Sequence, residues 1–181
     1  KAPKEEIVNL KFYRKAKKVI CQSSFHKKII YKNTKLENLI NVSGNLWSKK
    51  SLDILKNSSY KNKENIVSVL STNNWHKNTS DAINFCISKG LKYELISNSN
   101  YETFLNNFGR NKKFVFFPKT PETLSRVCVE ARMMNMSVIT NRNVGASYED
   151  WFNLKGIELI NLMIEKRDII SNIIIEIINE Q

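Results

Sequence analysis

The chain has few of the residues that hold small or metal-bound folds together. Its 181 residues include three cysteines, two histidines, five glycines and three prolines. The cysteines are odd in number, far apart and without a C-x-x-C pair, so neither a disulfide framework nor a zinc site is indicated. Free cysteine is among the most buried residue types, and we expect Cys21, Cys86 and Cys128 in the core. Two histidines give no basis for a histidine-rich metal site, and no metal is expected.

Long hydrophobic runs are also missing. The first ten residues, KAPKEEIVNL, are not followed by the apolar stretch of a signal peptide. The isoleucine-rich segment near the C-terminus comes nearest to a membrane span, but charged residues such as Glu165, Lys166 and Asp168 interrupt it. We therefore expect a cytoplasmic protein. Peripheral contact with a membrane surface stays open as an alternative.

Positive charge is what the chain has in excess, with 29 Lys and Arg against 17 Asp and Glu and a net charge of +12. This balance favours anionic partners: nucleotides, nucleic acid, anionic lipid head groups or phosphorylated acceptors. The chain is also rich in Asn and Ile, a combination typical of AT-rich genomes. The equal alternative to an anionic partner is that most of the excess lysine lies on the solvated surface and binds no ligand.

The first third of the chain predicts short elements. A basic helix over 4–18 leads into a strand over 19–21, and Ser23 or Ser24 can cap the next helix. A short strand over 39–42, a turn at 43–45 and a helix that starts at Trp47 follow. The polar stretch 57–65 predicts a loop and an internal boundary.

From Ile66 onward the pattern is regular. Apolar runs that predict strands alternate with stretches that predict helices, which is typical of a doubly wound, Rossmann-like α/β domain with a parallel sheet and helices on both faces. Ligands of such sheets bind outside the carboxyl ends of the strands, here the loops 71–80, 97–100, 118–122 and 141–147. The predicted strands are 66–70, 93–96, 114–117 and 137–140, and the predicted helices are 81–89, 101–108 and 123–134.

The start of the helix predicted over 123–134 is a candidate phosphate site. Thr120 can cap this helix, with Pro121 in its first turn. The free N–H groups of Thr123, Leu124 and Ser125 would then face the cleft at the strand ends, where free donors and the helix dipole bind phosphate.

Two carboxylates, Glu122 and Glu130, stand eight positions apart in the same segment. Eight residues are a little over two helical turns, so both side chains can share one face. By spacing alone they suit a general acid–base pair. Glu122 can equally serve the helix dipole, and Glu130, within an apolar stretch, needs a partner such as ribose hydroxyls or Arg126.

Other candidates lie in the neighbouring loops. Lys77 follows the first strand of the regular half, where its ammonium can reach a diphosphate. Trp75 and His76 beside it can stack on a base or sugar, or simply cover the loop. Gly145 and Ala146 form a loop that lets the backbone approach a ligand.

Together these residues resemble a known family. Glu122-x7-Glu130-Ala131, preceded by an apolar strand and Pro118, resembles the donor-side motif of retaining GT-B glycosyltransferases of the family 4 ("group 1") type. Lys77 stands at the place of the family's diphosphate-binding lysine, and Val144-Gly145-Ala146 with Glu149 looks like its Gly-containing turn and following Glu. The resemblance covers roughly residues 19–160.

The resemblance implies a role for each site residue. Lys77 neutralises the diphosphate leaving group, Glu122 lies at the transferred sugar as the catalytic-site carboxylate, and Glu130 accepts hydrogen bonds from the ribose. The N–H groups of Thr123 and Leu124 hold the phosphates, and Gly145 belongs to the donor-binding turn. Neither a metal nor a cofactor is implied beyond the nucleotide-sugar substrate.

The resemblance also implies an organisation. Residues 1–45 look like the end of a GT-B N-terminal domain, 46–165 like the nucleotide-sugar-binding domain and 166–181 like a C-terminal amphipathic helix. The implied function is transfer of a sugar from a nucleotide-diphosphate sugar to an unknown glycan, lipid or protein acceptor, with retention. An acceptor-binding domain is then missing from this chain.

Some positions depart from the family pattern. The segment 71–74 lacks the Arg that commonly precedes the lysine, Ser125 replaces a Gly, and Asn135 and Ser137 replace a Gly and a Pro. Two alternatives therefore stand beside the glycosyltransferase hypothesis. One is a non-catalytic basic module that binds nucleic acid or an acidic partner. The other is a catalytically inactive donor-like domain that serves as a scaffold.

Overall fold

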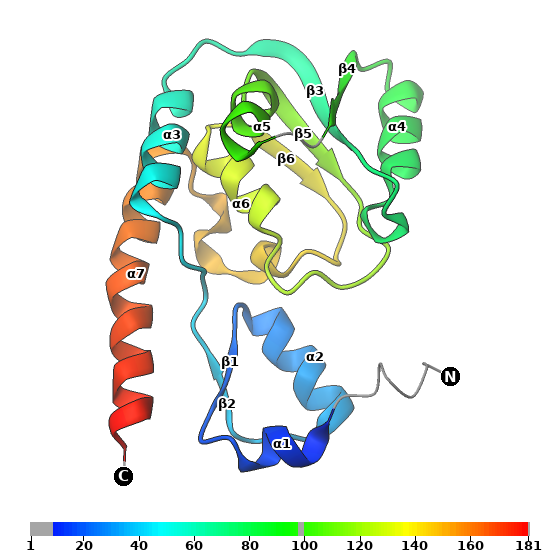
Figure 1. The fold of residues 1–181 in the computed structure, drawn as a ribbon. Helices are drawn as coiled ribbons and strands as arrows, with labels where there is room; N and C mark the ends of the chain where they lie inside the picture. Colours follow the sequence, from blue (N-terminus) through cyan, green and yellow to red (C-terminus); the bar gives the residue numbers. More distant parts are fainter. Residues whose placement is uncertain (1–8, 98–99, 181) are drawn as a thin grey trace.

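The computed structural model describes residues 9–97 and 100–180 and contains a two-stranded and a four-stranded parallel sheet (Figure 1). Helices cover the four-stranded sheet, so the prediction of a Rossmann-like α/β fold is confirmed. The first part of the helix predicted over 4–18 and positions 98–99 of the predicted loop 97–100 lie outside the described residues.

The two-stranded sheet belongs to residues 9–45, which we call the N-terminal unit. In this unit β1 pairs in parallel with β2, with Val19 opposite Leu39. Ser23 caps α2 as expected, because its Oγ accepts a hydrogen bond from the N–H of His26 at 3.0 Å. The elements are α1 (Leu10–Lys15), β1 (Val19–Cys21), α2 (Ser24–Thr34) and β2 (Leu39–Asn41).

The four-stranded sheet has the order β4-β3-β5-β6, and every pair is parallel. The chain enters at β3, moves outward to β4, and then returns to the other side of β3 to form β5. The strand order therefore reverses between β3 and β5, which is where such sheets bind ligands. The strands are β3 (Glu64–Ser71), β4 (Tyr93–Ser97), β5 (Asn111–Phe116) and β6 (Ser137–Thr140).

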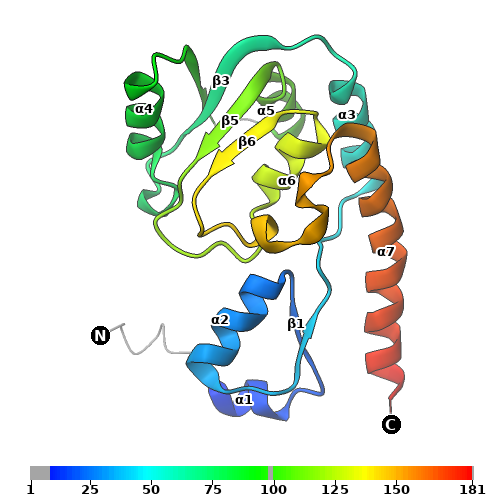
Figure 2. The ribbon, with the colours of Figure 1, turned by 180° about the vertical axis from the view of Figure 1, so that it is seen from behind.

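Helices cover both faces of this sheet (Figures 1 and 2). On one face, Ala82 and Cys86 of α4 pack with Val67, Val69 and Val115, which alternate along their strands as one face requires. The other face packs against α3, α5, α6 and α7 in the larger core. These helices are α3 (Lys49–Ser59), α4 (Thr79–Ser88), α5 (Tyr101–Phe108), α6 (Arg126–Met133) and α7 (Gly156–Asn179).

The predicted start of α6 is wrong. The helix begins at Arg126, not at Thr123, and Ser125 before it has a left-handed backbone with φ 68°. Glu122 forms a parallel bridge with Val144, which prevents this segment from joining the helix. Thr120 is therefore not the cap, and its hydroxyl instead pairs with Nδ1 of His76 at 3.2 Å.

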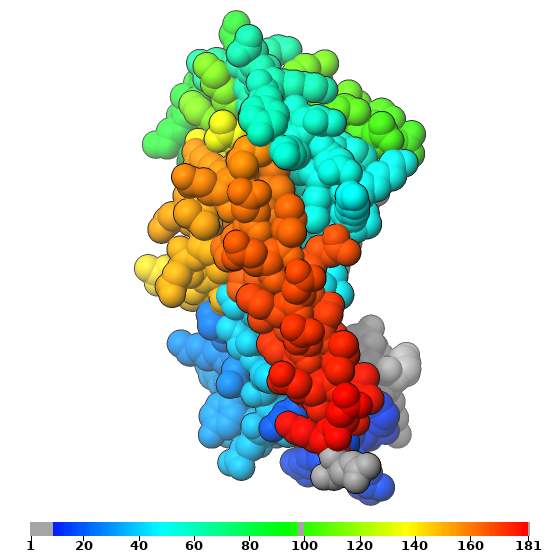
Figure 3. Space-filling model, turned by 90° about the vertical axis from the view of Figure 1, so that its left-hand side faces the viewer, coloured from blue at the N-terminus to red at the C-terminus, as the bar shows by residue number. Residues whose placement is uncertain are grey.

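The C-terminal helix is longer than the predicted segment 166–181. α7 is one continuous helix that begins at Gly156 and runs past the N-terminal unit (Figure 3). Nζ of Lys17 donates to the carbonyls of Ile177 and Ile178 at 3.4 Å, a cation at a helix C-terminus. Within the described ranges, no helix combines the length and the apolar character that crossing a bilayer requires.

The predicted loop 57–65 is shorter than expected, because α3 continues to Ser59 and β3 begins at Glu64. Within it, Nζ of Lys63 donates to the carbonyls of Ser58 at 3.2 Å and Gly109 at 2.5 Å. The ammonium thus caps the C-terminal ends of α3 and α5 together. Burial, and then the charge of Lys61, lowers the pKa of Lys63 to about 8.

This pKa makes stability depend on pH. Lys63 binds its proton less tightly in the folded chain than in the unfolded chain, so the resulting penalty is present below pH 8 and is relieved as the pH rises above 8. Between pH 7.5 and 9.5 the stability of the wild type should therefore rise relative to that of Lys63→Met, as measured by denaturant unfolding. Lys92→Met, at an exposed lysine, controls for the loss of one surface charge. Parallel pH curves for the wild type and Lys63→Met would contradict the prediction.

Candidate functional site

A cavity of about 320 Å³ lies at the carboxyl ends of β3 and β5, where the strand order reverses. Its volume is in the range of small-ligand pockets. The loops after these two strands bring together Lys77 and Glu122, as the sequence predicted for a strand-end site. The cavity is lined by Gln22, Asn45, Lys77, Glu122, Thr123, Leu124, Ser125, Arg126 and Val127.

Lys77 lies at the end of a short 3₁₀ turn, Trp75–Lys77, after β3. The turn closes on Asn78, which adopts a left-handed backbone and begins α4. Nδ2 of Asn78 donates to the carbonyl of Phe117 at 2.9 Å and so ties the loop after β3 to the end of β5. This tie holds Lys77 at the boundary between the two strands.

Glu122 and Lys77 form an ion pair, with Nζ 2.8 Å from Oε1. The side chains are 33% and 18% exposed for Lys77 and Glu122, so the pair is partly shielded from solvent. The backbone of Glu122 is fixed on both sides: its N–H donates to Asn143 at 2.7 Å and its carbonyl accepts from Gly145 at 3.0 Å. The fold therefore holds the backbone of Glu122 in place beside the cavity, and the lysine reaches its carboxylate along a flexible stem.

The backbone after Glu122 offers free donors. The N–H groups of residues 123–127 have no hydrogen-bond partner among residues 9–97 and 100–180, and the same residues line the cavity. Those of Thr123 and Leu124, predicted to lie in the first turn of the helix, precede it instead. Together with the first turn of α6 they form a run of donors that suits an anion.

Glu130 lies inside α6, and its side chain is only 5% exposed. Its Oε1 accepts from the indole of Trp47 at 3.1 Å and the hydroxyl of Tyr101 at 2.8 Å, and it pairs with Arg126 at 3.4 Å. Burial raises the pKa of this carboxyl, and these donors lower it in part. The expected partner Arg126 is present, whereas nothing in the sequence indicated Trp47 or Tyr101.

Gly145 is fixed by packing. A Cβ at this position would overlap the carbonyl oxygen of Thr123 and come within 2.5 Å of Oγ of Ser23. The glycine thus lets three segments meet, and it lies behind the cavity wall formed by residues 122–127. No other residue type fits there without displacing the backbone of Thr123.

The N-terminal unit contributes one wall that the sequence prediction missed. Gln22 and Asn45 line the cavity, and Oε1 of Gln22 accepts from the hydroxyl of Thr123 at 2.6 Å. Glu149 ties the unit down, because it accepts from the N–H of Ser24 at 2.6 Å and from the hydroxyl of Ser43. Glutamine and asparagine are common surface residues, so no sequence signal distinguished these two.

A second cavity of about 220 Å³ adjoins the first, since Lys77 and Val127 line both. Its wall is more apolar and comes from the ends of β3 and β4 and from α5. The remaining lining residues are Leu70, Ser71, Thr72, Ile96 and Phe104.

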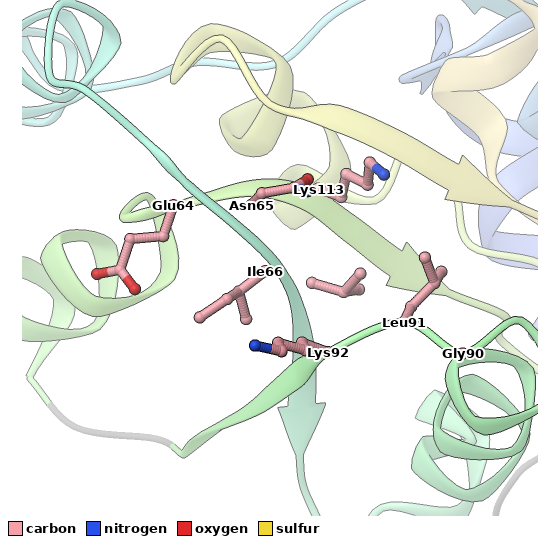
Figure 4. A pocket seen from close by; sticks show the side chains of 8 residues that line it. Glu64, Asn65, Ile66, Gly90, Leu91, Lys92 and Lys113 are labelled. Carbon is pink, nitrogen blue, oxygen red and sulfur yellow. The ribbon is translucent and has the colours of Figure 1, made fainter.

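A larger cavity, of about 570 Å³, lies at the opposite edge of the sheet (Figure 4). It is bordered by the start of β3, the residues before β4 and Lys113 of β5. These are the amino ends of the strands, whereas open parallel sheets bind ligands at the carboxyl ends. No group of His, Cys, Asp and Glu suited to a metal ion occurs in the described part of the chain.

We expect Gly145→Ala to destabilise the fold, because the added methyl group must push apart the backbone of Thr123 and the hydroxyl of Ser23. The expected loss is about 1–3 kcal/mol of unfolding free energy, the usual cost of overpacking. Gly44→Ala is the matched control, because neither Gly44 nor Gly145 has a left-handed backbone and the atom nearest to a Cβ at Gly44 belongs to the flexible side chain of Lys166, at 2.9 Å. Equal losses for the two variants in urea unfolding would show that the contact is not tight.

Comparison with known proteins finds a structural likeness. No family model and no curated protein matches the chain. Among solved structures, a crystal structure of a glycosyltransferase from Rickettsia africae ESF-5 is similar, with a TM-score of 0.48 and 16% sequence identity over 91% of this chain. The chain spans 57% of the length of that structure.

Proposed function

We propose that this chain is the donor-binding half of a GT-B glycosyltransferase of the family 4 type, which transfers a sugar from a nucleotide-diphosphate sugar with retention. The observation that carries the proposal is the cavity at the strand-order reversal, which joins Lys77, Glu122 and a run of free N–H groups. This combination offers a cation and donors for phosphate beside a carboxylate for hydroxyls. The family resemblance of the same residues supports the assignment of sugar transfer.

The proposed reaction develops negative charge on the leaving group. The bond between the sugar and the diphosphate oxygen breaks, and its electron pair stays on that oxygen. The acceptor hydroxyl bonds to the sugar, and its proton passes to the departing diphosphate or to water. Lys77 and the N–H groups of residues 123–127 stabilise the diphosphate as its charge grows, which lowers the barrier more than equal binding of the substrate would.

The nucleoside of the donor is assigned to the second cavity. Phe104 and Ile96 offer an apolar wall for a base, and Lys77, shared by both cavities, places the diphosphate between them. Glu130 would accept the ribose hydroxyls. Its Oε1 is already occupied by Trp47 and Tyr101, but Oε2 has no partner within the described residues.

Arg126 can replace the arginine that the family commonly has before the lysine. It lines the phosphate cavity and its side chain is half exposed. Its guanidinium lies 5.3 Å from the Trp47 ring and 3.4 Å from Glu130, and it would leave these partners to reach a phosphate.

The acceptor side is assigned to a further domain. The N-terminal unit has two short parallel strands, and so small a sheet needs more strands or packing to be stable. Residues 9–45 would be the end of that domain, as the resemblance implies. Two of these residues, Gln22 and Asn45, line the donor cavity.

One observation favours a second candidate, a non-catalytic basic module for nucleic acid. A cavity of about 380 Å³ is lined by Lys61, Lys63, Lys112 and Lys113 and by no carboxylate. Such a module would bind any polyanion with affinity that falls steeply with salt. Binding of single-stranded DNA at 50 and 200 mM salt, compared with binding of nucleotide sugars, separates the two candidates.

The proposed function predicts nucleotide binding with a specific role for Lys77. UDP-, GDP- and ADP-sugars are titrated calorimetrically, and at least one should bind. Lys77→Ala should weaken binding of the matching nucleoside diphosphate about tenfold or more, since a hydrogen bond to a charged group is lost, while nucleoside binding changes little. Lys50→Ala, at an exposed lysine that also pairs with a glutamate, is the control. Failure of all three donors to bind at millimolar concentration would falsify the proposal.

A further inference from the structure

The ion pair between Lys77 and Glu122 lies in the cavity to which the proposed function assigns the donor phosphates. Both residues line the same cavity, and their charged groups are 2.8 Å apart. The ammonium is therefore already neutralised. A phosphate that binds Lys77 must compete with a carboxylate that lies next to it.

The two partners differ in their freedom to move. Glu122 is fixed by backbone hydrogen bonds to Asn143 and Gly145 and by its bridge to Val144. Lys77 has a long flexible stem, is the more exposed of the two, and lies 5.7 Å above the Phe116 ring. An entering ligand can therefore draw the ammonium away, while the backbone that carries the shorter side chain of Glu122 keeps its carboxylate at the cavity.

A carboxylate that remains in the cavity treats two ligands differently. Its oxygens accept hydrogen bonds from hydroxyl groups, which the sugar of a nucleotide sugar supplies. A free nucleoside diphosphate brings a terminal phosphate instead, with more negative charge and few protons to donate. In a partly shielded site, like charges a few ångströms apart repel strongly.

We propose that Glu122 is a selectivity residue that makes the site prefer a sugar diphosphate over a bare diphosphate. This inference rests on the proposed donor-binding function and assigns Glu122 a task through its ion pair with Lys77. Before binding, the carboxylate holds Lys77 and raises the cost of binding phosphate alone. After transfer, the product lacks the sugar hydroxyls, and the return of Lys77 to Glu122 favours its release.

The test compares Glu122→Gln with the wild type, because glutamine keeps the size of the side chain and removes its charge. Pyrophosphate and the pairs UDP and UDP-glucose, GDP and GDP-mannose, and ADP and ADP-glucose are titrated calorimetrically. In Glu122→Gln, we expect pyrophosphate and the matching nucleoside diphosphate to bind about tenfold more tightly and the nucleotide sugar more weakly. Tenfold corresponds to about 1.4 kcal/mol.

Glu102→Gln is the matched control. Glu102 pairs with Lys50 at 3.7 Å on the exposed surface, with a side chain that is 57% exposed, so its loss removes one acidic charge without touching the cavity. Both ligands should bind this variant as they bind the wild type. Thermal unfolding of each variant shows whether it is folded before its affinities are compared.

The outcomes separate the two levels of the hypothesis. If no nucleotide sugar binds the wild type, the proposed function fails and the selectivity role fails with it. If a pair binds but Glu122→Gln weakens the diphosphate and the nucleotide sugar equally, donor binding stands and the selectivity role is wrong. The selectivity role is supported if Glu122→Gln shifts the ratio of affinities toward the bare diphosphate over the nucleotide sugar and Glu102→Gln does not.

Discussion

The site depends on the way the backbone of residues 122–124 is held against residues 143–146. Glu122 pairs with Val144, Gly145 donates to the carbonyl of Glu122, and Ala146 donates to that of Leu124. These bonds keep the segment out of the helix, so α6 begins only at Arg126 and the N–H groups of the preceding residues 123–125 stay free. They also fix the Glu122 carboxylate beside Lys77. One stretch of backbone pairing therefore produces the anion donors and orients the carboxylate.

The same pairing marks the limit of what the sequence shows. The apolar runs after Asn65 predict the strands, because a buried parallel strand has few alternatives to hydrophobic residues. α5 was predicted at its observed bounds, since its start and end are set locally by a polar cap and by Gly109. The start of α6 was missed because Thr120 and Pro121 form a valid local signal that contacts from over 20 residues away override. The partners of Glu130 differ in the same way. Arg126 is close in the sequence and was expected as a partner, whereas Trp47 and Tyr101 are distant in the sequence and were not.

The charge of the chain is a poor guide to the site. The excess of lysine predicts an anionic partner, but the cavity at the carboxyl edge contains one lysine, one arginine and one glutamate. Four lysines line a different cavity instead: Lys61, Lys63, Lys112 and Lys113. Among them, Lys63 caps the C-terminal ends of two helices. The cavity at the carboxyl ends of the strands is therefore distinguished by its arrangement of a few charges and free donors. Because the cavity is partly shielded from solvent, each electrostatic interaction in it is stronger than on the open surface.

The N-terminal unit is as much a part of this site as the large sheet is. Ser23 donates to the carbonyl of Thr123 at 2.5 Å, and Gln22 accepts from the hydroxyl of the same residue. Both contacts act on the segment whose N–H groups line the cavity. Any shift of residues 9–45 relative to the sheet would therefore be transmitted to those donors through Thr123, and Glu149 opposes such a shift through Ser24 and Ser43. The position of the N-terminal unit and the geometry of these free donors are thus physically coupled.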